Sequence, residues 1–170
     1  RLNELVNDLL TLNDPSDIRY ELIDARQMFT QIISELSSEN QYQIKLENQV
    51  CNITLWGDKI LLYRAFSNIV HNALKYNKPN GTIMITTQEG ENDIVVVITD
   101  TGIGIADNQL DDIFNPFYCV DKSRSRLLGG SGLGLPIVKL IIDKHGGKMQ
   151  IESDPGAFTQ VTISLPKNKY

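Results

Sequence analysis

The sequence predicts an α+β fold, a two-layer α/β sandwich in which three helices cover one face of a mixed, mostly antiparallel sheet of about five strands. Two patterns support this prediction. Three segments repeat apolar residues at helical spacing, and several short β-branched segments lie between turn signals. The chain has 170 residues, 41% hydrophobic and 22% charged, so it can bury one core and is not disordered, low-complexity or collagen-like.

The charge and the cysteines limit the classes of function. The formal net charge is −5, and an acidic protein is not expected to bind nucleic acid in general. Cys51 and Cys119 form no C-x-x-C pair, so they predict neither a disulfide framework nor a zinc site, and a reducing compartment is the default. No apolar stretch is long enough to span a membrane. Because the chain begins at Arg1 and not at Met, we expect a fragment of a longer protein.

The domain organisation follows from one amphipathic segment and one break. Residues 1–13 predict the end of a helix, with an apolar stripe formed by Leu2, Leu5, Val6, Leu9 and Leu12. Residues 14–17, which include a proline, read as a linker. We therefore expect the main domain at 18–166 and a short tail at 167–170.

The first half of the main domain predicts two helices, each begun by an aspartate. Asp24 and Gln27 resemble a capping box before a segment that is apolar on one face. Asp58 caps the second helix, which stops at the turn signal of residues 77–81. Short strands are expected at 19–22, 42–46 and 53–55.

The second half predicts two strand pairs separated by a long glycine-rich segment. Residues 82–87 and 94–99 form a hairpin. Residues 101–131 are poorly periodic apart from a short helix near 108–113, and segments of this kind are usually functional. A helix at 133–145 follows, with Pro136 in its first turn, and then a final strand pair at 149–153 and 160–165.

A polar stripe on the second predicted helix is the first candidate site. Asn68, His71, Asn72 and Lys75 share one face, opposite the apolar face. A solvated face would explain them, but such faces favour Glu and Lys over the poor helix former Asn. Asn oxygens can instead complete the shell of a Mg²⁺ ion on phosphates, and Lys75 can meet a phosphate.

Asp100, at the end of a predicted strand, is the second candidate. Gly102 and Gly104 follow it, so the backbone can pass close to a ring while the carboxylate accepts from an exocyclic amine. An ordinary Asp-Thr-Gly turn is the alternative.

A glycine cluster at 129–134 that runs into a helix is the third candidate. Its N–H groups and the helix N-terminus can bind an anion, whereas a flexible linker is the alternative. Lys122, Arg124 and Arg126 lie just upstream and make phosphate the natural partner. Neither a P-loop nor a dinucleotide fingerprint fits these glycines.

Taken in order, these segments resemble a known family, the bacterial sensor histidine kinases. Residues 68–76 resemble the N box, 100–104 the G1 box, 114–118 the F box and 130–135 the G2 box. His145-Gly146-Gly147 and the closing strand that ends at Leu165-Pro166 also match. The resemblance covers roughly residues 18–166, and four motifs in this order and spacing are highly specific.

The resemblance implies the ATP-binding catalytic domain, of the Bergerat type shared with DNA gyrase. It implies transfer of the ATP γ-phosphoryl group to a histidine outside this chain, for relay to an aspartate of a response-regulator receiver domain. It makes residues 1–13 the end of a dimerisation hairpin, and no phosphoacceptor motif of the family occurs here. The full-length protein is then expected to be a homodimer, with this chain in the cytoplasmic portion of a membrane-anchored receptor.

Site residues follow from the matching positions. Mg²⁺ would be held by Asn72, with Asn68 nearby, and residues 114–131 would be the ATP lid. The implied catalytic residues are Asn68, His71, Lys75 and Arg124. The residues implied for ATP or ADP are Asn68, Asn72, Lys75, Tyr76, Asp100, Gly102, Gly104, Ile105, Lys122, Arg124, Gly130, Ser131, Gly132, Leu133, Gly134 and Thr159.

The sequence departs from the family pattern at two places. The F box usually continues Phe-Tyr-Arg, but here Cys119 follows Tyr118, and that arginine helps to hold the γ-phosphate in relatives. The last glycine box is usually Gly-x-Gly-Thr, whereas Phe158 precedes Thr159 here. A non-catalytic nucleotide-binding signalling module with a degenerate lid, and a pure interaction domain, therefore stay open as alternatives.

Overall fold

The computed structural model describes residues 18–37, 43–120 and 131–168. The helices within them are α2 (Ala25–Leu36), α3 (Lys59–Lys75) and α5 (Gly134–Lys144), with the 3-10 helices η2 (Asp107–Gln109) and η3 (Asp112–Phe114). The strands are β1 (Glu21–Asp24), β2 (Lys45–Gln49), β3 (Thr54–Gly57), β4 (Thr82–Glu89), β5 (Asp93–Asp100), β6 (Lys148–Asp154) and β7 (Phe158–Pro166).

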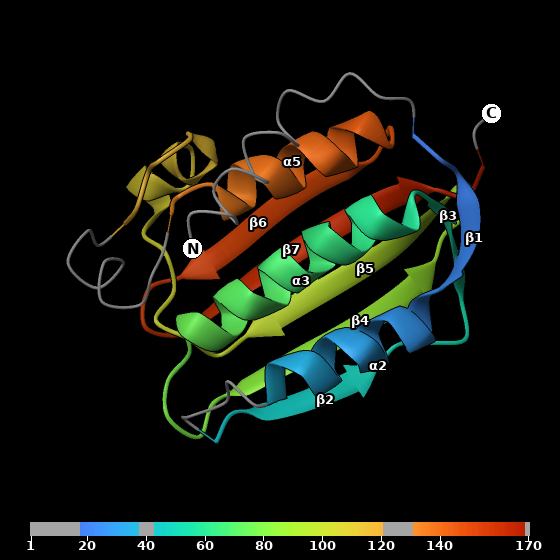
Figure 1. Cartoon of the computed structure of the whole chain (residues 1–170). Helices are drawn as coiled ribbons and strands as arrows, with labels where there is room; N and C mark the ends of the chain where they lie inside the picture. The colour runs from blue at the N-terminus through green and yellow to red at the C-terminus, as the bar shows by residue number, and fades with distance from the viewer. Residues whose placement is uncertain (1–17, 38–42, 121–130, 169–170) are drawn as a thin grey trace.

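One five-stranded sheet forms the floor of the domain. Its strand order is β2-β4-β5-β7-β6, and only the β2–β4 pair of these neighbours is parallel. Figure 1 shows α2, α3 and α5 lying on the same face of this sheet. The predicted α+β sandwich with a mostly antiparallel sheet is therefore confirmed.

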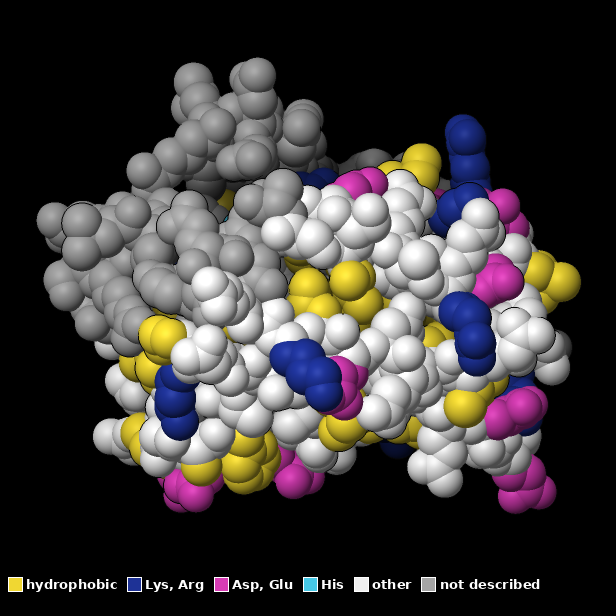
Figure 2. Space-filling model, turned by 90° about the horizontal axis from the view of Figure 1, so that it is seen from below, with side chains coloured by type: hydrophobic (Ala, Val, Ile, Leu, Met, Phe, Trp, Pro, Cys, Tyr) yellow, Lys and Arg dark blue, Asp and Glu magenta, His cyan; other side chains and the backbone are white. Residues whose placement is uncertain are grey.

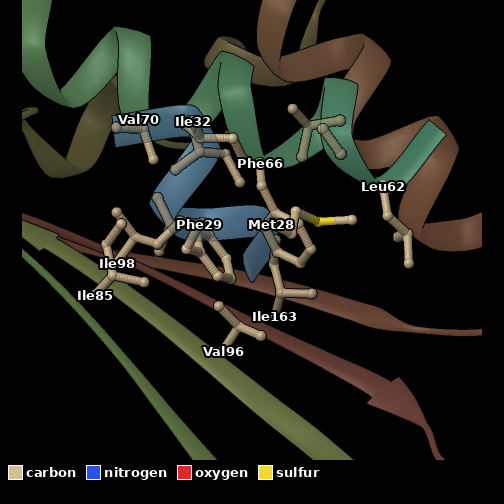
Figure 3. Packing of buried hydrophobic residues seen from close by; sticks show 14 of the residues in the cluster. Met28, Phe29, Ile32, Leu62, Phe66, Val70, Ile85, Val96, Ile98 and Ile163 are labelled. Atoms are coloured by element: carbon tan, nitrogen blue, oxygen red, sulfur yellow. The ribbon is translucent and has the colours of Figure 1, made fainter. Parts of the chain in front are cut away.

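The core lies between the helices and the sheet. Phe29 of α2 and Phe66 of α3 meet with ring centroids 4.9 Å apart. Ile85, Ile98 and Ile163 face these rings from three neighbouring strands (Figure 3). All five side chains are at most 2% exposed, and burying a side chain of this kind stabilises the fold by about 1.5–3 kcal/mol.

Both predicted helix starts are confirmed. The carboxylate of Asp24 accepts a hydrogen bond from the backbone N–H of Gln27 at 2.8 Å. The carboxylate of Asp58 accepts from Ile60 N at 3.0 Å and from Leu61 N at 3.1 Å. A cap of this type contributes about 1 kcal/mol, and it depends only on residues close in sequence.

The structure differs from the sequence prediction in how the short strands are used. The strands expected at 19–22 and 53–55 are β1 and β3, which pair with each other in a separate two-stranded sheet. The strand expected at 42–46 is β2, shifted to Lys45–Gln49, where it pairs in parallel with β4. These partners are distant in sequence, so local patterns do not encode the pairing.

The single short helix expected near 108–113 is instead the pair of 3-10 helices η2 and η3. Leu110 N donates to Asp107 O at 3.2 Å, and Asn115 N donates to Asp112 O at 2.9 Å. Each bond closes a three-residue turn, and runs of this geometry are usually short. The helix predicted at 133–145 is α5, within one residue at each end.

Several predictions fall outside the described residues, namely the helix end at 1–13, the linker at 14–17 and the lid positions 121–130. In the part of the chain that the structure describes, no helix has the length and apolarity needed to cross a membrane. Figure 2 shows one face of the molecule, where Lys and Arg side chains are scattered among Asp and Glu and do not gather into a patch.

Candidate functional site

Two asparagines of α3 lie against the first residue of α5. A Cβ atom on Gly134 would lie 3.7 Å from Asn72 Nδ2 and 3.9 Å from Asn68 Oδ1. Both asparagines are half-buried, which sets them apart from a solvated helix face. The N-terminus of α5 therefore begins beside two side-chain amides, which is an arrangement suited to an anion and its counter-cation.

The other polar residues of α3 are placed differently. His71 is exposed, although Asn68 and Asn72 on the same stripe are half-buried. Lys75, in the last turn, is half-buried, and its Nζ lies 4.9 Å from the centroid of the Tyr76 ring. The structure thus brings three of the four stripe residues toward one end of the helix pair, with His71 on the solvent side.

Asp100 is a buried carboxylate with one hydrogen bond from the described residues. Its side chain is 8% exposed, and Gly102 N donates to Oδ1 at 2.8 Å. Burial raises the pKa of Asp100 to about 6, although the Gly102 N–H and the positive charge of Lys78 act in the opposite direction. A carboxylate in this setting retains the capacity to accept from a further donor, such as an exocyclic amine.

The segment after Asp100 packs tightly against two other segments. Ile103 N donates to Tyr76 O at 3.0 Å, and a Cβ on Gly102 would lie 2.5 Å from the same oxygen. Gly104 has a φ of +67°, and a Cβ there would overlap the carbonyl of Asp154. The two glycines therefore let the backbone pass between the end of α3 and the β6–β7 turn.

β7 brings Thr159 next to this segment. Thr159 is the register partner of Asp100, and its Oγ1 lies 3.0 Å from Ser153 Oγ. Ser153 Oγ also accepts from Ile105 N at 2.8 Å, so Ile105 is tied to the same strand pair. Sequence reasoning missed Ser153, and nothing in its local sequence marks it.

The glycine cluster is described from Ser131 onward. Gly132 O accepts from Phe117 N at 2.9 Å, which joins the F-box segment to the start of α5. Leu133 N donates to Ser131 Oγ at 3.3 Å, while the side chain of Leu133 is fully buried in the core. Leu133 can therefore face a ligand only through its backbone. The other residues expected here, Lys122, Arg124 and Gly130, lie outside the described residues.

Lys78 is the second residue that sequence reasoning missed. It follows α3 within a turn segment, and its ammonium group donates to the carbonyl oxygen of Gly156. In the sequence, Lys78 is marked only by the turn pattern, which gives no indication of its partner.

Across the described ranges, no group of three or more His, Cys, Asp or Glu side chains could hold a metal ion.

Comparisons with known proteins show the family of this chain. Residues 57–169 match the family model described as histidine kinase-, DNA gyrase B-, and HSP90-like ATPase. The sensor histidine kinase RppB of Synechocystis sp. is 35% identical over 98% of this chain and 38% of its own length. The chain thus spans only about a third of the length of the curated relatives it matches.

Solved structures are also similar. The mycobacterial sensor histidine kinase MprB is 30% identical, with a TM-score of 0.76, over 87% of this chain and 97% of that one. Full-length ShkA in complex with AMPPNP has a TM-score of 0.85 over 97% of this chain and 35% of that one. At 23% identity, ShkA shows likeness of fold alone.

Proposed function

The chain belongs to the histidine kinase-, DNA gyrase B- and HSP90-like ATPases, as a catalytic and ATP-binding domain of the bacterial sensor histidine kinases, and from this premise we propose its chemistry. The domain binds ATP with Mg²⁺ and transfers the γ-phosphoryl group to a histidine outside this chain. That phosphoryl group then passes to an aspartate of a response-regulator receiver domain.

One observation carries the proposal, namely the carboxylate of Asp100, which has one hydrogen bond from the residues that the structure describes. It is buried at a strand end, accepts one hydrogen bond from Gly102, and is followed by a backbone that Gly104 allows to bend closely. These features suit a carboxylate that accepts from the N6 amine of adenine. Tyr76 and Ile105, which belong to the two adjoining segments, would flank the base.

The phosphates would lie at the start of α5. Backbone N–H groups at a helix N-terminus favour phosphate, and Lys75 adds a positive charge near the end of α3. Asn68 Oδ1 and the side-chain amide of Asn72 lie beside Gly134. The amide oxygens of the two asparagines would hold Mg²⁺. When bound, Mg²⁺ would neutralise charge on the phosphates, as phosphoryl transfer requires.

Little covalent chemistry is asked of the protein itself. Phosphoryl transfer depends mostly on positioning and on electrostatic stabilisation. Lys122 and Arg124, together with the backbone of 130–134, would complete the phosphate contacts from the lid. We further propose that residues 1–13 end a dimerisation hairpin, that the whole protein is a homodimer, and that this chain is the cytoplasmic portion of a membrane-anchored receptor.

A calorimetric titration tests the proposal directly. The chain is titrated with ADP and with AMPPNP, each with and without Mg²⁺, and GDP serves as the control for the base. We expect micromolar, adenine-specific binding that Mg²⁺ strengthens for AMPPNP, and Asn72→Ala should abolish the Mg²⁺ effect. Absence of binding at millimolar nucleotide would overturn the proposal.

A non-catalytic nucleotide-binding module is the second candidate, because Cys119 stands where relatives carry an arginine. Such a module would bind ATP and signal through its lid without transfer. Cys119→Arg is tested with a phosphoacceptor hairpin supplied in trans. A faster transfer than in the wild type would mean that Cys119 limits an active kinase. If both proteins bind ATP and neither transfers phosphate, the non-catalytic module is correct.

A further inference from the structure

Three segments close around one side of the proposed base site. They are the end of α3 with the turn after it, the segment after β5, and the β6–β7 turn. Ile103 N donates to Tyr76 O at 3.0 Å, and Gly156 N donates to Ile103 O at 2.7 Å. The first bond joins the end of α3 to the segment after β5, and the second joins that segment to the β6–β7 turn. Neither bond joins the β6–β7 turn directly to the turn after α3.

Lys78 joins the turn after α3 to the β6–β7 turn. Its ammonium group donates to Gly156 O, so the carbonyl and the N–H of Gly156 are held by two different segments. The backbone of Lys78 is itself fixed, since Lys78 N donates to Oδ1 of the buried Asn77 at 2.9 Å and Gly81 N donates to Lys78 O at 3.0 Å. Lys78 is thus the side-chain link in a closed ring of contacts.

The same ammonium group acts on Asp100. Its positive charge lowers the pKa of Asp100, as does the Gly102 N–H, while burial raises that pKa to about 6. The other titratable side chains on the segments packed here include Lys75 and Tyr76 at the end of α3 and Asp154 at the end of β6. Lys75 is also a cation, and its Nζ lies over the Tyr76 ring, 4.9 Å from the ring centroid. Lys78 is the cation that both closes this ring of contacts and lowers the pKa of Asp100.

We propose that Lys78 is a positioning residue for the nucleotide base, which clamps the β6–β7 turn onto the segment after β5 and stabilises the charged form of Asp100. The inference rests on the proposed function, in which Asp100 accepts from the adenine amine. An ionised carboxylate is the stronger acceptor. The charge of Lys78 would then extend strong binding of the base to lower pH.

The test is the pH dependence of ADP affinity, measured by calorimetry between pH 5.5 and pH 8 for four proteins. They are the wild type, Lys78→Gln, Lys78→Arg and the matched control Lys148→Gln. Lys148 is exposed at the opposite end of β6 and undergoes the same loss of charge.

Loss of the Lys78 charge raises the pKa of Asp100 above about 6, which lowers the ionised fraction at pH 6 and barely changes it at pH 8. We therefore expect Lys78→Gln to weaken ADP binding measurably at pH 6 and much less at pH 8. Lys78→Arg should restore the wild-type profile, and Lys148→Gln should leave it unchanged. Because loss of a purely structural contact would weaken binding similarly at every pH, the profile separates the two roles.

A second measurement keeps this inference separate from the proposed function. The carboxyl carbon of Asp100 is titrated by NMR in the nucleotide-free protein, where its midpoint should rise in Lys78→Gln but not in Lys148→Gln. If ADP binds and Lys78→Gln behaves like Lys148→Gln, the inference is wrong and the proposed function stands. If ADP does not bind at all, the proposed function fails, and the base-positioning role of Lys78 fails with it even where the NMR midpoint moves.

Discussion

The two ends of the α3–α5 pair each hold a buried titratable side chain, and the two are partnered differently. Where α5 ends and α3 begins, His145 is 3% exposed, and both ring nitrogens have partners. Nδ1 lies 2.7 Å from Ile141 O, and Nε2 accepts from Asp58 N at 3.0 Å. At the other end lies Asp100, which is 8% exposed and accepts from Gly102 among the described residues.

The difference separates a structural residue from a candidate ligand-binding residue. His145 joins the end of α5 to the start of α3 and packs its ring against Tyr20, with centroids 5.7 Å apart. Burial lowers the pKa of His145, so the ring stays neutral and its hydrogen-bonding capacity is used within the fold. Burial raises the pKa of Asp100 to about 6, and that carboxylate keeps capacity for an outside donor. Both side chains are buried, but of the two only the Asp100 carboxylate keeps hydrogen-bonding capacity for a ligand.

The largest effect is expected for His145→Ala. The change removes a buried ring and leaves Asp58 N–H without its partner, whereas Ile141 O keeps the backbone N–H of residue 145. The free energy of unfolding should fall by about 3–4 kcal/mol, measured by urea denaturation. ADP affinity, measured where the variant is folded, should stay close to that of the wild type. A large affinity loss with unchanged stability would reverse the roles assigned to the two ends.

Asp100→Asn should have opposite effects on binding and on stability. Loss of one charge-assisted hydrogen bond weakens ADP binding by about 1.5–3 kcal/mol, which is ten- to a hundredfold. The raised pKa means that ionised Asp100 destabilises the free fold at pH 7, since 3.8 to about 6 corresponds to about 3 kcal/mol. The amide can still accept from Gly102, so the variant should unfold at a higher temperature. Unchanged ADP affinity would contradict the role of Asp100.

The pH dependence of stability should distinguish the two groups by sign. Asp100 has a raised folded-state pKa, so its contribution rises by about 1 kcal/mol as the pH falls from 7 to 5. His145 has a lowered folded-state pKa, so its contribution is fully present above the unfolded value of 6.5 and falls as the pH drops below it.

Two variants separate the pH-dependent contributions of Asp100 and His145 to the free energy of unfolding. In Asp100→Asn, the free energy of unfolding should decline more steeply on acidification than in the wild type. In His145→Gln, the decline should become shallower or reverse. Denaturant titrations at pH 7, 6 and 5 provide the measurement. Equal pH slopes in the three proteins would show that neither group titrates differently on folding.

The smallest effects concern two glycines at opposite ends of α5. A methyl group on Gly134 would make ordinary contacts with Asn72 and Asn68, so Gly134→Ala should stabilise the fold by about 0.5–1 kcal/mol. The same methyl group would crowd the proposed phosphate site and weaken AMPPNP binding. Gly146 has a φ of +69°, so Gly146→Ala should destabilise by about 1 kcal/mol without weakening binding. Thermal unfolding and calorimetry on both variants check this contrast.

The sequence predicted the parts of the fold that depend on neighbours along the chain. The starts of α2 and α3 follow from Asp24 and Asp58, because a cap bonds to N–H groups two or three residues away. The hairpin of β4 and β5 follows from alternation on either side of a turn. Periodicity did not reveal the separate β1–β3 sheet or the parallel pairing of β2 with β4.

The candidate site likewise has features that the local sequence predicts and features that depend on long-range packing. Residue types and order alone predicted that Asn72, Asp100 and the glycines form a nucleotide site, because each motif lies within a few residues and keeps its chemistry wherever the fold places it. Only the tertiary structure decided that Asp100 is buried with Gly102 as its hydrogen-bond partner among the described residues, and that Gly134 lies against Asn68. The hydrogen bonds from Lys78 to Gly156 and from Asp58 to His145 are also known only from the tertiary structure. The partners are separated by 78 positions in the first pair and by 87 in the second. Burial and long-range partners arise only when distant segments pack together, and they determine which polar groups remain open to a ligand.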